Sequence, residues 1–149
     1  MRAVVQRVTE GSVTIPEQNY EVKIRKGFVV LLGIKNGDAE KDSIFLADKC
    51  SSLRIFEDEN EKMNLSLKDI DGEMLVVSQF TLYGDAQKGN RPSFIEAAKP
   101  DEAIPLYEKF ISKVKDNIGD SKVKTGIFGA MMNVKIFNDG PVTIIIESK

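Results

Sequence analysis

A short apolar run limits the folds that this chain can adopt. Every residue from 28 to 34 is apolar or glycine, and several are β-branched or aromatic. The run is far shorter than the roughly 20 residues that a membrane-spanning helix needs. Such side chains favour a strand, and a strand without polar side chains must be covered on both faces. Residues 28–34 are therefore predicted to form a central, buried strand.

Strands dominate the rest of the prediction, and two segments have helical spacing. Apolar side chains recur every three to four residues in 39–53 and 101–118, which predicts a helix in each. Gly11 is predicted to turn the chain, and the sequence NDG at residues 138–140 is typical of a hairpin turn. Further strands are expected at residues 3–8, 12–15, 20–24, 53–56, 73–81, 123–125, 132–137 and 142–147.

This order of elements predicts a mixed α/β domain with strands in the majority. Two helices cannot cover both faces of a large sheet. We therefore expect a strand-rich, three-layer β/β/α arrangement, in which two sheets form a barrel-like core and both main helices lie on one side. The length of 149 residues suits one domain that spans residues 1–149.

The composition excludes several classes of chemistry. The chain has no histidine and a single cysteine, Cys50. A catalytic unit of the Ser-His-Asp or Cys-His kind is therefore impossible, and neither a histidine-ligated nor a thiolate zinc site can be built. Catalysis would have to use carboxylates, lysine, tyrosine, hydroxyls, backbone amides or groups on the substrate.

Cysteine usage and charge give expectations about location and partners. A lone cysteine fits a reducing compartment. The sequence shows neither a signal peptide nor a membrane-spanning run, so a cytoplasmic protein with no membrane partner is expected. The net charge of −2 argues against strong non-specific binding of nucleic acid, but it leaves room for a local basic patch.

Residues 78–83 form the first candidate site. Ser78, Gln79, Phe80 and Thr81 come at the end of a predicted buried strand, where hydroxyls, an amide side chain and freed backbone N–H groups meet. Such N–H groups can stabilise an oxyanion. The alternative interpretation is that the hydroxyls only satisfy backbone groups at a strand end.

Three further segments contain glycine and are weaker candidates. Gly140-Pro141 could hold a cis peptide bond that presents two carbonyls on one side, or it could be an ordinary turn. Lys88 and Arg91 lie in a polar loop that could contact phosphates or could simply be solvated. The glycines of GIFGA at residues 126–130 could form the floor of a small pocket or could mark a bulge.

Several segments, taken together and in order, resemble one family. They are MRAVVQRV at 1–8, LRIF at 53–56, KMNLS at 62–66, SQFTLY at 78–83, KGNRPSF at 88–94, TGIFGA at 125–130 and NDGPVT at 138–143. The chain is similar in these segments to bacterial D-aminoacyl-tRNA deacylases, from residue 1 to about residue 147. The resemblance implies a homodimer with active sites at its interface and no metal or cofactor. It also implies hydrolysis of the ester that joins a D-amino acid, or glycine mischarged onto alanine tRNA, to the terminal adenosine.

The resemblance implies how chirality is read. In that family the Gly-Pro bond is cis. Gly140 and Pro141 would therefore enter the pocket of the partner subunit and accept hydrogen bonds from the α-ammonium group of the substrate. An L-residue would drive its side chain into this backbone and be rejected. Arg7 would hold the motif in place.

The resemblance also implies where the ester is held. The segment with Ser78, Gln79, Phe80 and Thr81 would bind the carbonyl, with the backbone N–H groups of Phe80 and Thr81 as oxyanion donors. Because no histidine can activate the Thr81 hydroxyl, the 2′-OH of the tRNA would help to activate water. An aminoacyl ester is reactive enough for positioning and an oxyanion hole to suffice.

Other pocket and tRNA contacts follow from the same resemblance. Phe128 and Gly129 match the pocket wall of the family, and Ala103 matches a small residue near the terminal adenine. Lys88 and Arg91 are the candidates for contacts to tRNA.

One position departs from the family pattern, and other functions stay open. Many members have an acidic residue where this chain has Met131. The first alternative function is a catalytically silent, RNA-binding homodimer, which Lys88 and Arg91 would support. The second is a structural dimer or a small-molecule binder, which would not distinguish D-esters from L-esters.

Overall fold

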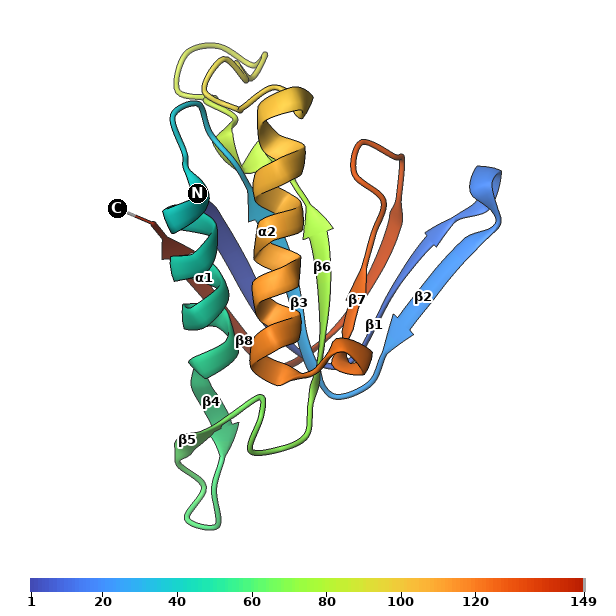
Figure 1. Ribbon diagram of the computed structural model, residues 1–149, viewed down its shortest axis with the longest axis vertical. Coiled ribbons are helices and arrows are strands. Elements are labelled where there is room, and N and C mark those ends of the chain that lie inside the picture. Colours follow the sequence, from blue (N-terminus) through green and yellow to red (C-terminus); the bar gives the residue numbers. More distant parts are fainter. Residues whose placement is uncertain (149) are drawn as a thin grey trace.

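A strongly curved, six-stranded sheet forms the centre of the structure, a computed structural model that describes residues 1–148 (Figure 1). The strand order is β2-β1-β3-β6-β7, and β8 pairs with β1. These strands are β1 (Arg2–Ile15), β2 (Tyr20–Ile24), β3 (Gly27–Gly33), β6 (Glu73–Ser78), β7 (Val123–Thr125) and β8 (Asn133–Glu147). A second sheet of two strands consists of β4 (Arg54–Glu57) and β5 (Met63–Ser66).

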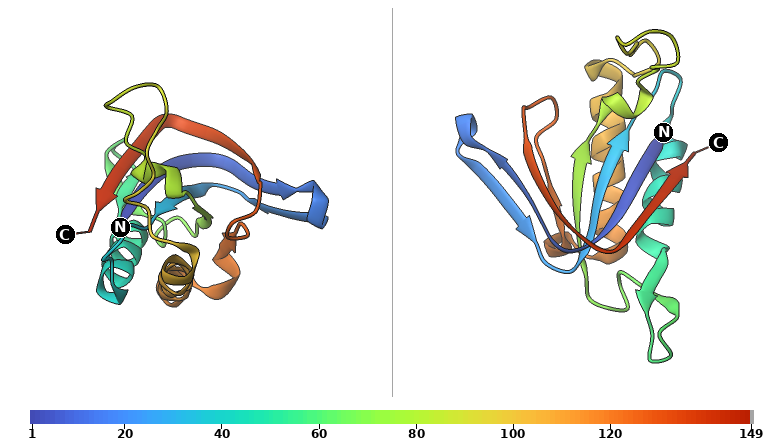
Figure 2. Two further views of the ribbon diagram at one scale, coloured as in Figure 1. Left: turned by 90° about the horizontal axis from the view of Figure 1, so that it is seen from above. Right: turned by 180° about the vertical axis from the view of Figure 1, so that it is seen from behind.

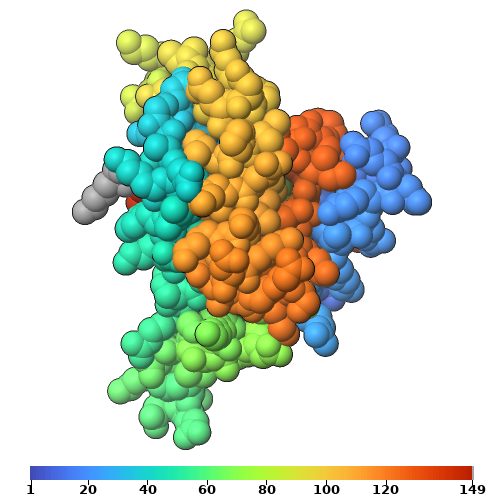
Figure 3. Space-filling model, in the orientation of Figure 1, coloured from blue at the N-terminus to red at the C-terminus, as the bar shows by residue number. Residues whose placement is uncertain are grey.

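Two helices cover one face of the large sheet. α1 (Glu40–Ser52) and α2 (Pro100–Ile118) lie side by side against it (Figures 1, 2 and 3). Three short 3-10 turns complete the chain: η1 (Pro16–Gln18), η2 (Phe80–Tyr83) and η3 (Asp120–Lys122). No helix among residues 1–148 is long and apolar enough to cross a lipid bilayer.

β3 separates two hydrophobic cores. Phe28 and Val30 face the core beneath the helices, which also contains Phe110 of α2. Val29, which points to the opposite face, belongs to a second core with Leu75 of β6. The second core is enclosed because the outer halves of β1 and β8 curl back with β2, which gives the sheet its barrel-like form (Figure 2). The prediction of a central strand covered on both faces is confirmed.

The predicted fold class is also confirmed. The structure is a mixed α/β fold with a barrel-like large sheet, a small second sheet and two main helices on one side. The barrel-like core is one continuous six-stranded sheet, and the second sheet is the separate β4-β5 ribbon. The helices predicted at 39–53 and 101–118 differ from α1 and α2 by one residue at most at each end.

Two predicted turns are wrong. Gly11 lies inside β1, where a Cβ atom would sit 2.6 Å from Cγ2 of Val29, so this glycine serves the close approach of two strands. The NDG sequence at 138–140 does not form a hairpin turn, because β8 continues through it and pairs with the same strand, β1, on both sides of the segment. Shifts in the β1–β8 register between Gln6 and Glu10 absorb the irregular segment.

Smaller differences concern strand ends. The strand predicted at 73–81 stops at Ser78 and gives way to η2. The strand predicted at 53–56 is β4, one residue further along the chain. Its partner β5 lies in a segment for which no strand was predicted, because it is only four residues long and none of them is buried.

Candidate active site

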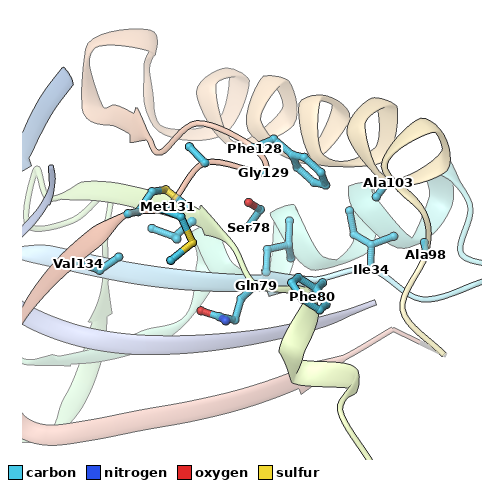
Figure 4. A pocket seen from close by; sticks show the side chains of 14 residues that line it. Ile34, Ser78, Gln79, Phe80, Ala98, Ala103, Phe128, Gly129, Met131 and Val134 are labelled. Atoms are coloured by element: carbon cyan, nitrogen blue, oxygen red, sulfur yellow. The ribbon is translucent and has the colours of Figure 1, made fainter. Parts of the chain in front are cut away.

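A pocket of about 300 Å³ opens where β6 ends (Figure 4). It lies between the ends of β3 and β6, the start of α2 and the segment after β7. Its lining includes no charged side chain, and Ser78 and Gln79 supply the only polar ones. Phe80, Ala103 and Phe128 lie toward one end of the pocket in Figure 4. The pocket therefore suits a neutral, partly aromatic group and offers no side-chain base.

The turn at the end of β6 frees backbone donors. β6 pairs with β3 as far as Ser78, and the Gln79 N–H still donates to the Leu32 carbonyl at 2.8 Å. η2 then begins, and the first N–H groups of such a turn have no partner within it. The N–H groups of Phe80 and Thr81 donate to no acceptor in the described part of the chain. Two unpaired donors beside a neutral pocket form a suitable oxyanion hole.

Thr81 lies beside the pocket rather than in its lining. Its Oγ1 accepts a hydrogen bond from Nε2 of Gln79 at 2.5 Å. No carboxylate or amine among residues 1–148 makes a hydrogen bond to this hydroxyl, so no side chain is placed to remove its proton. The hydroxyl therefore lacks the base that a serine- or threonine-type nucleophile requires.

Phe128 and Ala103 line the far wall, and Tyr107 supports Phe128 from behind. The ring of Phe128 packs edge-on against that of Tyr107, with centroids 5.6 Å apart, and the Tyr107 hydroxyl donates to the Val76 carbonyl at 3.0 Å. Burial raises the pKa of Tyr107, so its hydroxyl remains a neutral donor. Ala103, in the first turn of α2, is buried, and its small side chain leaves the pocket open.

Hydrogen bonds from Arg7 connect the Gly140–Pro141 segment to the small sheet. Arg7 is buried; its Nη1 donates to the Ile55 carbonyl at 2.7 Å and to Glu57 at 2.9 Å, and its Nε donates to the Asp139 carbonyl at 3.2 Å. The guanidinium thus joins β4 to the residue that precedes Gly140.

The Gly140–Pro141 peptide bond is cis, and both residues are exposed. They do not lie at the pocket of their own chain. Arg7 pairs with Phe28 at the start of β3, whereas Ser78 pairs with Leu32 near its end. Four residues of strand separate the two levels, or about 13 Å. Within one chain, the proposed chirality filter and the proposed carbonyl site are therefore apart.

Of the other residues predicted to contact the substrate, some line the pocket and some do not. Gly129 lines the pocket beside Phe128. Lys88 and Arg91 are exposed in the loop that follows η2, and neither reaches the pocket lining. Met131 does line the pocket and is 89% exposed, so the position that departs from the family pattern stands at the pocket's rim.

Several lining residues were not singled out from the sequence. They are Leu32, Ile34, Val77, Ala98, Met132 and Val134. All are apolar, so nothing in their chemistry distinguished them from the core. The one available signal was position, since Ile34 follows directly on the central strand and Ala98 directly precedes a predicted helix.

The comparisons with known proteins agree with this geometry. The family model described as D-Tyr-tRNA(Tyr) deacylase matches residues 4–147. A D-aminoacyl-tRNA deacylase from Flavobacterium psychrophilum is 56% identical over 149 residues, which cover 100% of this chain and 98% of that protein.

Two solved structures have the same fold. A protein described as c-Myc DNA Unwinding Element Binding Protein superimposes with a TM-score of 0.92 at 42% identity, covering 100% of this chain and 99% of the other. A probable eukaryotic D-amino acid tRNA deacylase reaches a TM-score of 0.84 at 19% identity, covering 99% and 98% of the two chains, and shows the fold alone.

The matches place the chain in a class of hydrolases directed at aminoacyl-tRNA. It belongs to the D-aminoacyl-tRNA deacylase family. The family expected from the motifs is thus confirmed, and with it the prediction that the chain is a hydrolase of this kind.

Proposed function

We propose that this protein hydrolyses the ester of D-aminoacyl-tRNA, and of glycine mischarged onto alanine tRNA, as a proofreading step of translation in the cytoplasm. The observation that carries the proposal is the neutral pocket at the end of β6 with the unpaired N–H groups of Phe80 and Thr81 beside it. The pocket has a volume of about 300 Å³, and its uncharged lining suits the neutral base of an adenosine. The family membership supplies the substrate class.

In this proposal, backbone N–H groups stabilise the charge that develops during the reaction. The ester carbonyl points at the Phe80 and Thr81 N–H groups, which stabilise the negative charge that develops on its oxygen. Ser78 and Gln79 bound the site from the strand side. The 2′-OH of the terminal adenosine helps to remove a proton from water as it adds to the carbonyl carbon. The bond to the 3′ oxygen then breaks, and that oxygen takes up a proton.

The chirality filter requires a second copy of the chain. Arg7, which holds the residue before Gly140, lies about 13 Å along the sheet from the level of Ser78. If the Gly140–Pro141 motif and the pocket both act on one substrate, the motif must come from a partner subunit, so a homodimer with shared sites is part of the proposal. Arg7 is then a positioning residue, because it holds the backbone of Asp139 and does not itself meet the substrate. The motif's carbonyls accept hydrogen bonds from the α-ammonium group, and an L side chain collides with them.

Release of amino acid from D-Tyr-tRNA and L-Tyr-tRNA, measured side by side in EDTA with buffer alone as control, tests the proposal. We expect rapid release from the D-ester only. Equal release from both esters would contradict the filter. No release from either would favour the alternative of a catalytically silent, RNA-binding homodimer, in which Lys88 and Arg91 make the contacts to tRNA.

A further inference from the structure

Two phenylalanines form an exposed aromatic pair at the rim of the pocket. The rings of Phe80 and Phe94 meet edge-to-face, with centroids 5.2 Å apart and planes at 72°. Phe80 is 56% exposed and Phe94 is 39% exposed, and neither belongs to the two hydrophobic cores. Phe80 also lines the pocket (Figure 4), so the pair leads from the pocket outward onto the surface.

The second ring of this pair is held in place by its own loop. The Ser93 and Asp85 backbones exchange two hydrogen bonds of 2.8 Å, which fix the residue before Phe94. Its ring lies against Gly84, where a Cβ atom would come within 2.8 Å of Cε1 of Phe94. Glycine at this position therefore lets an aromatic ring rest on the backbone. An exposed ring that is ordered in this way loses little freedom when a ligand packs on it.

The loop that carries Phe94 also carries cationic side chains. Lys88 and Arg91 are exposed near its tip, and no carboxylate in the described part of the chain lies within 4.0 Å of either charge. Asp85, in the same loop, accepts a hydrogen bond from the Gln87 N–H at 2.9 Å. An aromatic face beside unpaired cations is the usual combination for binding single-stranded nucleic acid.

We infer that Phe94, supported edge-on by Phe80, is a stacking platform for the base of the nucleotide that precedes the terminal adenosine of the tRNA. The inference rests on the proposed function and extends it by one nucleotide. When the terminal adenosine occupies the pocket, the preceding nucleotide lies outside it, and the Phe80–Phe94 pair offers that nucleotide an exposed aromatic surface at the rim. Unstacked bases in single-stranded RNA are bound by aromatic side chains, and stacking tolerates any base.

A pair of dinucleotide esters isolates this contact. The substrates are the D-tyrosyl ester of cytidylyl-adenosine and the same ester without the cytosine base, which keep the same phosphate and terminal adenosine. We expect the wild-type protein to prefer the complete ester by about tenfold in kcat/KM, the size typical of one stacked base. Phe94→Leu should abolish this preference and leave hydrolysis of the abasic ester within about twofold of wild type.

Two further variants separate stacking from a loss of structure. Phe94→Tyr keeps an aromatic face and should retain the preference. Phe45→Leu, at a phenylalanine of α1 that is 38% exposed and far from the pocket lining, is the matched control and should also retain it. Equal loss on both esters in Phe94→Leu would overturn the inference, because it would mean that the ring only supports the fold or the pocket.

Other outcomes distinguish this inference from the proposed function. A wild-type protein that hydrolyses D-Tyr-tRNA but treats the complete and abasic esters alike overturns the platform and leaves the deacylase proposal standing. Hydrolysis of D-Tyr-tRNA without hydrolysis of either dinucleotide ester also overturns it, because pocket and platform together are argued to bind both nucleotides. A wild-type protein that hydrolyses none of the three substrates overturns both proposals.

Discussion

At the scale of single residues, our proposal assigns catalysis in this pocket to backbone groups rather than to a nucleophilic side chain. Ser78 and Gln79 are the only polar side chains in the lining, and the Thr81 hydroxyl is bonded to the amide of Gln79. The absence of histidine from the sequence agrees with this arrangement, because no imidazole exists to activate a hydroxyl.

Replacement of Thr81 by alanine tests that view directly. Thr81→Ala removes the hydroxyl and keeps the backbone N–H that we assign to the oxyanion hole, so turnover of D-Tyr-tRNA should persist within about tenfold of wild type. Single-turnover hydrolysis, with tRNA binding measured separately, gives the answer. Complete loss of turnover with intact binding would show that the hydroxyl is the nucleophile and that the 2′-OH mechanism is wrong.

At the scale of elements, the parallel pairing of β3 with β6 fixes the pocket, because the pocket opens where these two strands end. Their other ends meet at Gly27, which pairs with Glu73. A Cβ atom on Gly27 would lie 1.8 Å from the Glu73 carbonyl oxygen, a contact that only movement of the backbone could relieve.

The variant Gly27→Ala should therefore destabilise the protein by about 3 kcal/mol or more, since it forces two core strands apart. Gly37→Ala is the matched control: its φ of +84° is unfavourable for alanine, but no atom lies within 4 Å of the added Cβ. The control should cost about 1–2 kcal/mol. Urea denaturation of both variants measures the difference, and equal losses would contradict the steric argument.

The β4-β5 ribbon makes part of the stability depend on pH. The hydrogen bond from Arg7 holds the pKa of Glu57 below its ordinary value of 4.5. The unfolded chain therefore takes up a proton at a higher pH than the folded chain does. This contribution to stability is fully present above the ordinary value and is lost as the pH falls through the lowered pKa.

Urea midpoints measured between pH 7 and pH 3 detect this loss. Glu57→Gln should have a lower midpoint at pH 7 and should lose less on acidification than wild type. Glu59→Gln, in the neighbouring turn, removes an exposed carboxylate that makes no ion pair within the described residues, so it serves as the control. Parallel profiles for wild type and Glu57→Gln would contradict the coupling to Arg7.

Element types were predictable from local patterns, whereas turns inside the long strands were not. The run at 28–34 and the helical spacing at 101–118 identify β3 and α2, because each pattern reports burial along one element. The NDG sequence at 138–140 marks an irregularity in the pairing of β8 with β1, whereas Gly11 lies in a regularly paired part of β1. Local sequence cannot separate a bulge from a turn, because that choice depends on the partner strand.

The candidate site, too, was predictable from the sequence only in part. Ser78, Phe80 and Phe128 were predicted from motifs, and the structure places them around one pocket. Ile34 and Ala98 were missed, because an apolar lining residue has the same composition as a core residue. That Gly140 lies far from the pocket of its own chain could not be seen in the sequence, because it depends on the register of β1 with β3 and β8.

At the scale of the whole molecule, one sheet face is suited to a second copy of the chain. Val4 alternates with the buried Val5 and therefore points away from the helices. It pairs with Leu31 on one side and Ile145 on the other, and Ile145 is 64% exposed. Beside this row, Oε1 of Gln6 is buried without a hydrogen-bond partner among the described residues, which leaves an acceptor for a partner's donor.

The variant Ile145→Lys should convert the proposed dimer into a monomer, because it places a charge at the most exposed position of this apolar row. Met63→Lys is the control, since Met63 is also exposed but lies on β5, in the other sheet. Sedimentation velocity at several concentrations measures the outcome. A dimer that persists in Ile145→Lys would place the interface elsewhere on the molecule.

If each active site combines the pocket of one subunit with the filter of the other, mixtures of two inactive variants should regain activity. Ala103→Phe fills the pocket, and Gly140→Ala displaces the filter, because its Cβ would lie 2.8 Å from Cγ2 of Val142 and 3.2 Å from Arg7. Each variant alone should be inactive on D-Tyr-tRNA. After subunit exchange, half of the dimers are mixed, and each has one site with an intact pocket and an intact filter.

Mixing should therefore restore about one quarter of the wild-type activity. This recovery follows only if the pocket and the filter of each site come from different subunits. If both came from one chain, every site in the mixture would contain a defect, and the mixture would stay as inactive as its components. The Ile145→Lys background provides the control, because activity should not recover where subunits cannot pair.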